Sequence, residues 1–150
     1  MLRTQYRCHP RIAGISNKLF YEQRLLNGVT EQDRKPLIAG LPTLLFIDMG
    51  VGKEQKAVKN NSYSNDAEMS VVLKLLGRLT SCQVAVEDIG VISLYKEQVD
   101  RLNEHLNTEQ ATNKGIQIST VDAFQVSTRR EDTVVLSGGG DTDATYLLVM

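Results

Sequence analysis

Short apolar runs and longer helical stripes alternate along the chain, which indicates strands joined by helices. Runs of five to seven mostly apolar residues predict buried strands at residues 43–49, 89–94, 115–119 and 133–137. Apolar side chains three or four residues apart predict helices at residues 10–20, 66–79 and 96–106. Strands that alternate with helices form a mostly parallel sheet with helices on both faces. We therefore expect an α/β fold.

Two of the predicted helices have recognisable starting residues. Pro10 stands in a first turn, where helices tolerate proline, and Asn65 is a preferred N-cap in front of Asp66 and Glu68. Residues 50–64 are polar and show no apolar periodicity, so we expect a loop there. The final apolar residues, 146–150, are long enough for a last strand at most.

Length and composition set limits on what the chain can do. It has 150 residues, enough for one domain, with 41% apolar and 23% charged residues, as in ordinary folded proteins. A net charge of -1 excludes nucleic-acid binding by bulk positive charge, so any such contact must be local. No apolar run approaches the roughly 20 residues that span a bilayer, and no signal segment is apparent. We expect a soluble, intracellular protein without a membrane partner.

Residue spacing argues against a metal centre and a complete ATP site. The two cysteines and two histidines lack the local spacing of metal ligands, so we expect no metal site. Gly50-Val51-Gly52-Lys53 follows a predicted strand, as a phosphate-binding loop does. A Walker A loop requires Gly-x-x-x-x-Gly-Lys followed by Ser or Thr, however, and Glu54 follows this lysine.

Residues 5–10, Gln-Tyr-Arg-Cys-His-Pro, combine an arginine with an aromatic ring before a predicted helix. Such a pair can place a planar charge on a phosphate and stack a ring on a base; alternatively, Tyr6 packs and Arg7 is a solvated surface charge. Residues 2–10, with 19–21 and 26–29, resemble motif IV of superfamily 1B helicases and its continuation, most similarly to the GRF-type zinc-finger-containing DNA helicases. The resemblance implies that Gln5 and Tyr6 border the nucleotide base. Arg7 would approach the γ-phosphate of ATP on a preceding RecA-like domain, as an arginine finger.

Residues 119–125, Ser-Thr-Val-Asp-Ala-Phe-Gln, resemble motif V of the same helicases. The resemblance implies that the Ser119 and Thr120 hydroxyls contact the nucleic-acid backbone and that Gln125 borders the nucleotide. Neutral hydroxyl contacts to phosphates suit a chain without net positive charge. The alternative is that Asp122 merely caps a turn.

A third match lies at residues 91–98, which resemble the family's strand ending in Thr-Pro-Tyr, with Leu94 in place of the commoner proline. Ser93, Tyr95 and Lys96 would then hydrogen-bond to, stack on or attract a single strand. The segment also fits an ordinary junction between a strand and a helix, and both interpretations stay open.

The resemblance covers residues 2–137 but departs from the family at functional places. Val126 stands where the family has glycine, and a β-branched residue does not copy glycine's backbone freedom. Glu131 would replace the ribose-facing carboxylate only if the loop rearranged. Motifs I to III are absent, and residues 138–150 lack the arginine of motif VI. We expect a fragment of a helicase, with a RecA-like domain at residues 1–137 and a divergent tail at 138–150.

The resemblance implies that the fold is a RecA-like three-layer domain, incomplete at its C-terminus. The function is that of the C-terminal motor domain of an ATP-dependent superfamily 1 helicase on single-stranded DNA, or RNA. ATP with Mg²⁺ would be bound mainly by the first RecA-like domain, the expected protein partner, and this chain alone should not hydrolyse ATP. The expected location is the nucleus and the expected process DNA repair. A non-catalytic nucleic-acid-binding module and a purely structural domain are the alternatives.

Overall fold

The computed structural model describes residues 3–35, 38, 40, 42–48, 52–108, 115–125, 133–137 and 145–149. A five-stranded sheet lies at its centre, in the order β3-β9-β8-β6-β7. Its strands are β3 (Leu44–Asp48), β6 (Ile89–Ser93), β7 (Gln117–Thr120), β8 (Thr133–Ser137) and β9 (Thr145–Val149).

The sheet is parallel except at one strand. β6 runs parallel to both β7 and β8, whereas β9 runs antiparallel to β8 on one side and to β3 on the other. The prediction of an α/β fold with a mostly parallel sheet is therefore confirmed. The last apolar segment forms the one antiparallel strand of this sheet, and it lies inside the sheet rather than at its edge. The proposed division at residue 137 stays a prediction.

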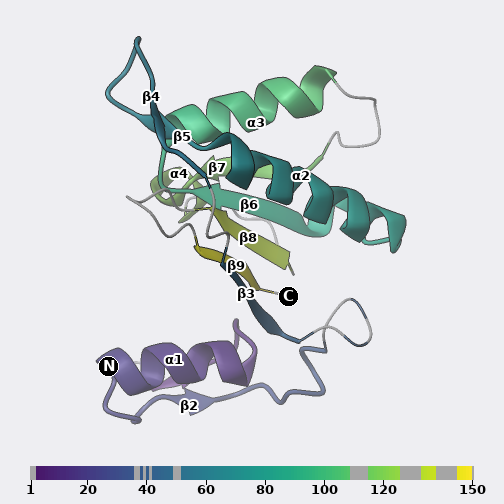
Figure 1. The fold of residues 1–150 in the computed structure, drawn as a ribbon. Coiled ribbons are helices and arrows are strands. Elements are labelled where there is room, and N and C mark those ends of the chain that lie inside the picture. Colours follow the sequence, from purple (N-terminus) through teal and green to yellow (C-terminus); the bar gives the residue numbers. More distant parts are fainter. Residues whose placement is uncertain are drawn as a thin grey trace.

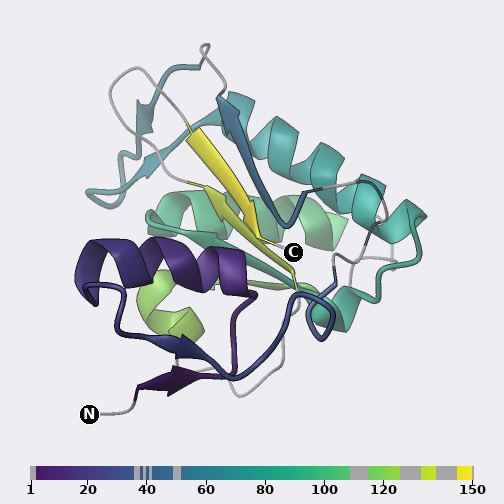
Figure 2. The ribbon, with the colours of Figure 1, turned by 90° about the horizontal axis from the view of Figure 1, so that it is seen from below.

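Two helices cover one face of the sheet, and a third helix lies beyond the other face. α2 (Asp66–Ser81) and α3 (Lys96–Thr108) lie side by side on one face (Figure 1). α1 (Pro10–Phe20) lies beyond the other face, next to the short parallel pair β1 (Thr4–Gln5) and β2 (Leu26–Asn27) (Figure 2). The short helix α4 (Val121–Gln125) follows β7 directly. The helices predicted at residues 10–20, 66–79 and 96–106 are confirmed.

The core lies between the sheet and the pair α2 and α3. The apolar stripe of α2 packs against β6 and against α3. The central residues of this core, which come from all three elements, are at most 2% exposed: Val72, Leu76, Leu79, Ile89, Val91 and Leu102. Burying a side chain of this size stabilises a fold by about 1.5–3 kcal/mol. The core therefore fixes the position of β6 and, with it, of the residues that follow β6.

Two segments that we expected to be irregular have regular structure. The segment expected to be a loop contains a hairpin, in which β4 (Gln55–Lys56) pairs antiparallel with β5 (Tyr63–Ser64), and residues 121–125, where the alternative was a turn capped by Asp122, form the helix α4. The expectation of a loop at 50–64 was wrong because two-residue strands are too short to show an alternating pattern. The same shortness hides β1 and β2. A 3-10 turn, Val86–Asp88, precedes β6.

Candidate functional site

The side chain of Gln5 holds a turn around Arg7. Its Oε1 accepts hydrogen bonds from the backbone N–H groups of Arg7 (3.0 Å) and Cys8 (2.8 Å). Its Nε2 donates to the carbonyl oxygen of Cys8 (2.9 Å) and to Oδ1 of Asn27 (2.7 Å). A carboxamide offers two acceptor lone pairs and two donors, so the turn uses all four. The sequence suggested that Gln5 borders the nucleotide; in the structure, its side chain fixes the backbone on both sides of Arg7.

Arg7 itself points its charge at solvent. Its side chain is exposed and forms no hydrogen bond or ion pair with any residue that the structure describes. A guanidinium stays charged throughout the physiological pH range and presents five donors in a fixed plane. A rigid turn therefore presents a group that suits bidentate binding of a phosphate.

Tyr6 is held at its ring and at its carbonyl. Its ring lies so close to Gly28 that a Cβ at that glycine would overlap it, which explains the need for glycine there. Nη2 of Arg34 donates a hydrogen bond to the Tyr6 carbonyl oxygen (3.0 Å). The residue nevertheless remains 64% exposed. The ring is thus positioned while much of its surface stays available for stacking.

Arg34 follows a small turn that sequence reasoning missed. Oδ2 of Asp33 accepts hydrogen bonds from the Thr30 backbone N–H (2.8 Å) and from the Thr30 hydroxyl (2.7 Å). These hydrogen bonds, the hydroxyl's first, lower the pKa of the Asp33 carboxyl below its usual value, and the neighbouring charge of Arg34 acts in the same direction. The sequence Thr-x-x-Asp at residues 30–33 was the available signal for this turn.

His9 and Pro10 begin helix α1 directly after the turn. The Nδ1 atom of His9 accepts a hydrogen bond from the Arg11 backbone N–H (3.1 Å) and so caps the helix. Pro10 occupies the first helical position, as predicted. The predicted apolar stripe of α1 is present but mostly uncovered, since Leu19 is 65% and Phe20 77% exposed.

Three residues in register mark the edge where β6, β7 and β8 end. Ser93, the last residue of β6, stands in register with Thr120 on β7 and with Ser137 on β8. The three strands run in the same direction, so their carboxyl ends form one edge, which is where open α/β sheets bind ligands. We call the ends of these strands, with the residues that follow β6, the carboxyl edge.

The two serines predicted at this edge differ in their surroundings. Ser93 is only 1% exposed, and its Oγ accepts a hydrogen bond from the Tyr95 backbone N–H (3.2 Å). Ser119 stands opposite Ile92, and alternation along the strand directs it to the face away from Thr120. Its Oγ is buried and has no hydrogen-bond partner among the described residues. Ser93 therefore shapes the turn that carries Tyr95, and the hydroxyl of Ser119 is enclosed on the face away from Thr120.

Tyr95 and Lys96 follow β6 at the start of α3. The Tyr95 ring meets the ring of Tyr63 edge to face, with centroids 5.5 Å apart and an interplanar angle of 69°. Nζ of Lys96 lies 3.3 Å from Oδ1 of Asp100, but the Lys96 side chain is 70% exposed. Exposed pairs of this kind contribute about 0–1 kcal/mol. Lys96 can therefore exchange its carboxylate for a phosphate at little cost.

A buried polar network joins the starts of α2 and α3 behind this edge. The Gln98 side chain, 2% exposed, accepts a hydrogen bond from the Asn65 N–H (2.9 Å) and donates one to the Asn65 carbonyl oxygen (3.3 Å). Oδ1 of Asn65 in turn caps α2 by accepting from the N–H groups of Ala67 (3.0 Å) and Glu68 (3.3 Å). Asn65 was correctly predicted as the cap. Gln98 was not predicted, because a polar residue in a helix gives no sign that it is buried.

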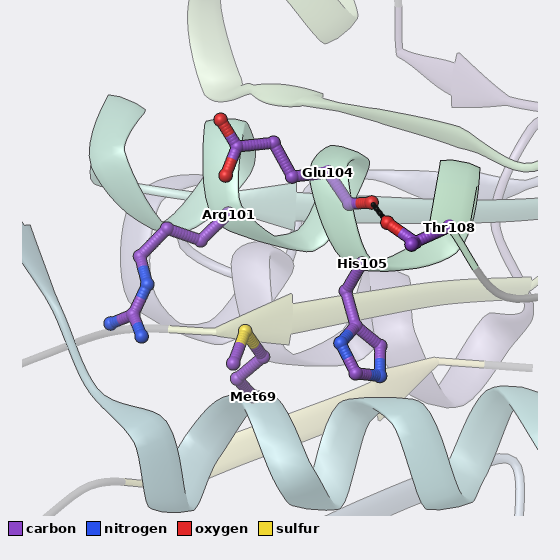
Figure 3. A pocket seen from close by; sticks show the side chains of 5 residues that line it. All are labelled: Met69, Arg101, Glu104, His105 and Thr108. Atoms are coloured by element: carbon purple, nitrogen blue, oxygen red, sulfur yellow. Dashed lines mark hydrogen bonds between the residues drawn. The ribbon is translucent and has the colours of Figure 1, made fainter.

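A pocket of about 260 Å³ lies between α2 and α3, away from the predicted site residues. Figure 3 shows Met69 of α2 facing Arg101 and His105 of α3, and Glu104 and Thr108 complete the lining. The guanidinium of Arg101 is engaged, since it lies 2.6 Å from Oδ1 of Asp66 and donates to Oγ of Ser64 (2.9 Å). The lining therefore combines apolar and polar side chains, and the Arg101 guanidinium is already paired with residues of the chain.

The predicted residues thus fall into two groups. Ser93, Tyr95, Lys96 and Thr120 come together at the carboxyl edge, with Ser119 beside them on the strand. The residues of the first motif, Gln5 to Arg7, lie on the separate unit of β1, β2 and α1 (Figure 1).

Two further predicted site residues, Gln125 and Glu131, lie at or beyond the end of α4. The backbone of Gln125 ends α4, while its side chain and Glu131 lie outside the described residues. Within the described part of the chain, no three His, Cys, Asp or Glu residues gather as metal ligands would. Likewise, no described helix is long and apolar enough to cross a membrane.

Comparisons with known proteins identify similar sequences over most of the chain. The model of a family described as "AAA domain" matches residues 1–138. The chain is 45% identical over 128 residues to the 5'-3' DNA helicase ZGRF1 of Mus musculus, which covers 83% of this chain and 7% of that protein. It is 32% identical over 148 residues to the regulator of nonsense transcripts 1 homolog of Neurospora crassa, covering 91% of this chain and 13% of that protein. The chain thus spans only a small part of the length of these relatives.

Proposed function

Because this chain belongs to the AAA domain family, as the C-terminal RecA-like domain of a superfamily 1 helicase, we propose that it is the second motor domain of an ATP-dependent helicase. Its proposed substrate is single-stranded DNA, a preference supported by the similarity to a mouse DNA helicase. A nuclear location and a role in DNA repair belong to the same proposal, and imaging of a tagged protein tests the location.

The proposal assigns Arg7 to the nucleotide. The observation that carries it is the turn in which Gln5 uses all four of its hydrogen-bonding positions and leaves Arg7 exposed and unpaired among the described residues. An arginine fixed in this way can stabilise the charge that develops on the γ-phosphate oxygens during hydrolysis, without reorganising at the moment of reaction. Tyr6 would stack on the base, and Gln5 would act through the turn.

The phosphates themselves need another binding site. The 150 residues contain no Gly-x-x-x-x-Gly-Lys-Ser or Gly-x-x-x-x-Gly-Lys-Thr sequence. In the proposal, ATP with Mg²⁺ is therefore held mainly by a first RecA-like domain, and Arg7 reaches it across the cleft between domains. Gln125 and Glu131 are proposed to border the nucleotide from this side.

The carboxyl edge is assigned to the single strand. Tyr95 offers a ring on which a base can stack, and Lys96 offers a charge that is only weakly paired. Thr120 supplies a hydroxyl for a backbone phosphate, a contact that positions a strand without reading its sequence, whereas the buried Oγ of Ser119 is not assigned a phosphate contact. Ser93 positions Tyr95 through the hydrogen bond between its Oγ and the Tyr95 N–H.

The test measures ATP hydrolysis with the first RecA-like domain of the mouse relative, in the presence and absence of this chain. We expect the chain alone to be inactive and to stimulate hydrolysis by that domain. Arg7→Ala should remove most of the stimulation, because arginine fingers are worth about 10³–10⁵ in kcat. Arg78→Ala, at an exposed arginine of α2, is the matched control and should stimulate normally. Equal stimulation by both variants, or hydrolysis by the chain alone, contradicts the assignment.

A second candidate function is a nucleic-acid-binding module without ATP hydrolysis. It is favoured by the fact that the carboxyl edge forms within this chain, from residues that need no second domain. Salt-dependent binding of a single strand without any stimulation of hydrolysis would support this function. An absence of both activities would point to a purely structural domain.

A further inference from the structure

We propose that the β4–β5 hairpin forms one wall of the single-strand-binding surface, with Lys56, Lys59 and Tyr63 as its contact residues. The inference rests on the proposed function in one respect, because it assumes that a strand crosses the carboxyl edge. It adds a segment that no sequence motif indicated and that we had expected to be a loop.

Side-chain hydrogen bonds attach the hairpin to the start of α3. The Ser62 Oγ accepts a hydrogen bond from the Glu97 backbone N–H (3.1 Å), and Nδ2 of Asn60 donates to Oε2 of Glu97 (3.1 Å). One turn further along α3, Nη1 of Arg101 donates to Oγ of Ser64 on β5 (2.9 Å). Since α3 begins directly after β6, these contacts place the hairpin beside the carboxyl edge, as Figure 1 shows.

Aromatic rings continue from the edge onto the hairpin. Tyr63 of β5 meets Tyr95 edge to face at 5.5 Å, and Nζ of Lys56 lies 5.8 Å from the centroid of the Tyr63 ring. Both tyrosines are half-buried, so their orientation is fixed while part of each ring remains accessible. Two neighbouring rings with a cation beside them match the needs of a strand, whose bases stack and whose phosphates attract lysine.

The charge of the hairpin favours a polyanion. Lys53, Lys56 and Lys59 are all exposed, and none is in a salt bridge with a described residue. The nearby carboxylates are less available, because Glu54 is half-buried and Glu97 accepts a hydrogen bond from the hairpin. A chain with a net charge of -1 can bind nucleic acid only through such a local concentration of lysines.

The tip of the hairpin is open to an incoming ligand. Val58 lies between Lys56 and Lys59 and is 103% exposed, so its side chain packs against nothing in the described part of the chain. Behind the tip, the Ala57 N–H donates to the Ser62 carbonyl oxygen (2.9 Å) and closes the loop. The lysines thus lie on a hairpin that is closed by a backbone hydrogen bond and attached to α3.

The test is a titration of fluorescent oligodeoxythymidine with the 150-residue chain at several salt concentrations, repeated with oligouridine of equal length. The double variant Lys56→Gln with Lys59→Gln should weaken binding about tenfold. For this variant, the slope of log K against log salt concentration should be shallower by about 1.4, since each lost phosphate contact on a single strand reduces the slope by about 0.7. Lys18→Gln with Lys74→Gln carries the same change of net charge on exposed lysines of α1 and α2, and it should bind within twofold of the unaltered chain.

A second pair of variants tests the ring. Tyr63→Phe keeps the stacking surface and should bind normally, whereas Tyr63→Leu should weaken binding several-fold. If the hairpin variants bind like their controls while the unaltered chain binds the strand, the hairpin proposal is wrong and the proposed function stands. If the unaltered chain binds neither oligonucleotide, the proposed strand-binding function fails first, and the hairpin proposal fails with it.

Discussion

The carboxyl edge and the unit of β1, β2 and α1 hold their functional side chains by different means. At the carboxyl edge, Tyr95 and Lys96 follow a strand whose residues Ile89 and Val91 are fully buried, and Gln98 ties the next helix to α2. In the other unit, Arg7 depends on one local side chain, that of Gln5. The edge is thus fixed by the domain core and the arginine turn by its own hydrogen bonds.

This difference matches the two proposed tasks. A surface that binds a nucleic-acid strand within one domain can be held entirely by the core of that domain, because no second domain has to complete it. An arginine that reaches a nucleotide on another domain needs local precision and an open approach. The uncovered apolar face of α1, with Leu19 and Phe20, shows that the described part of the chain does not enclose this unit.

The largest expected effect comes from comparing two leucines, one in the core that fixes the carboxyl edge and one in the unit of β1, β2 and α1. Leu76 of α2 is 1% exposed and Leu19 of α1 is 65% exposed. Leu76→Ala should lower the free energy of unfolding by about 2–5 kcal/mol, since it removes buried surface and leaves a cavity. Leu19→Ala should change it by less than about 0.5 kcal/mol. Urea denaturation measures both, and equal losses would show that the two regions do not differ in packing.

The next effect concerns the polar network behind the edge. Gln98→Ala leaves the buried N–H of Asn65 without its partner, while the Asn65 carbonyl oxygen keeps its hydrogen bond from the Met69 N–H. The unpaired N–H should cost about 1–3 kcal/mol of unfolding free energy. Asn107→Ala, at an exposed position on the same helix, is the control and should have little effect. The same denaturation experiment measures both variants. A Gln98 variant as stable as the control would refute the view that this network fixes the edge.

A smaller and more local effect is expected at Gly28. A Cβ at this position would displace the Tyr6 ring, so Gly28→Ala should reduce the stimulation of partner-domain ATP hydrolysis about tenfold, or about 1.4 kcal/mol. Strand binding should not change. Gly77→Ala provides the control, because a Cβ there meets nothing within 4 Å. Loss of strand binding in the Gly28 variant would mean that the two regions act as one.

The smallest effect is a pH dependence in the turn that carries Arg34. Hydrogen bonds from Thr30 lower the pKa of Asp33 in the folded state, so its contribution to stability is present above the unfolded value of about 3.9. That contribution disappears as the pH falls through the folded pKa. Asp33→Asn should therefore be slightly less stable than the unaltered chain at pH 7, and equally stable in strong acid. A stability difference that persists in acid would exclude the carboxylate as its cause.

The fold was predictable from the sequence where periodicity was long enough. The stripe from Val72 to Leu79 and the apolar run of β6 gave α2, β6 and the parallel sheet correctly. The β4–β5 hairpin escaped because its strands have two residues each, and hydrogen bonds from the start of α3 help to hold it. Such tertiary contacts leave no periodic signal in sequence.

Residue roles were harder to predict than residue positions. The sequence indicated that residues 5–7 form one unit. It gave no sign that all hydrogen-bonding positions of the Gln5 side chain would be occupied within the turn and by Asn27. It likewise placed Ser93 at the end of a strand without showing that burial would remove its hydroxyl from solvent. Both outcomes depend on hydrogen-bond geometry, which a motif match does not specify.

The most direct test of this division of labour is the affinity for single-stranded DNA of two variants of the chain, Tyr95→Leu and Arg7→Ala. The account predicts that Tyr95→Leu weakens binding about tenfold, since a stacked base contributes about 1–3 kcal/mol. Arg7→Ala should bind within twofold of the unaltered chain, because the proposal assigns Arg7 to the nucleotide and the strand to the carboxyl edge. An Arg7→Ala variant that loses as much affinity as Tyr95→Leu would contradict the account.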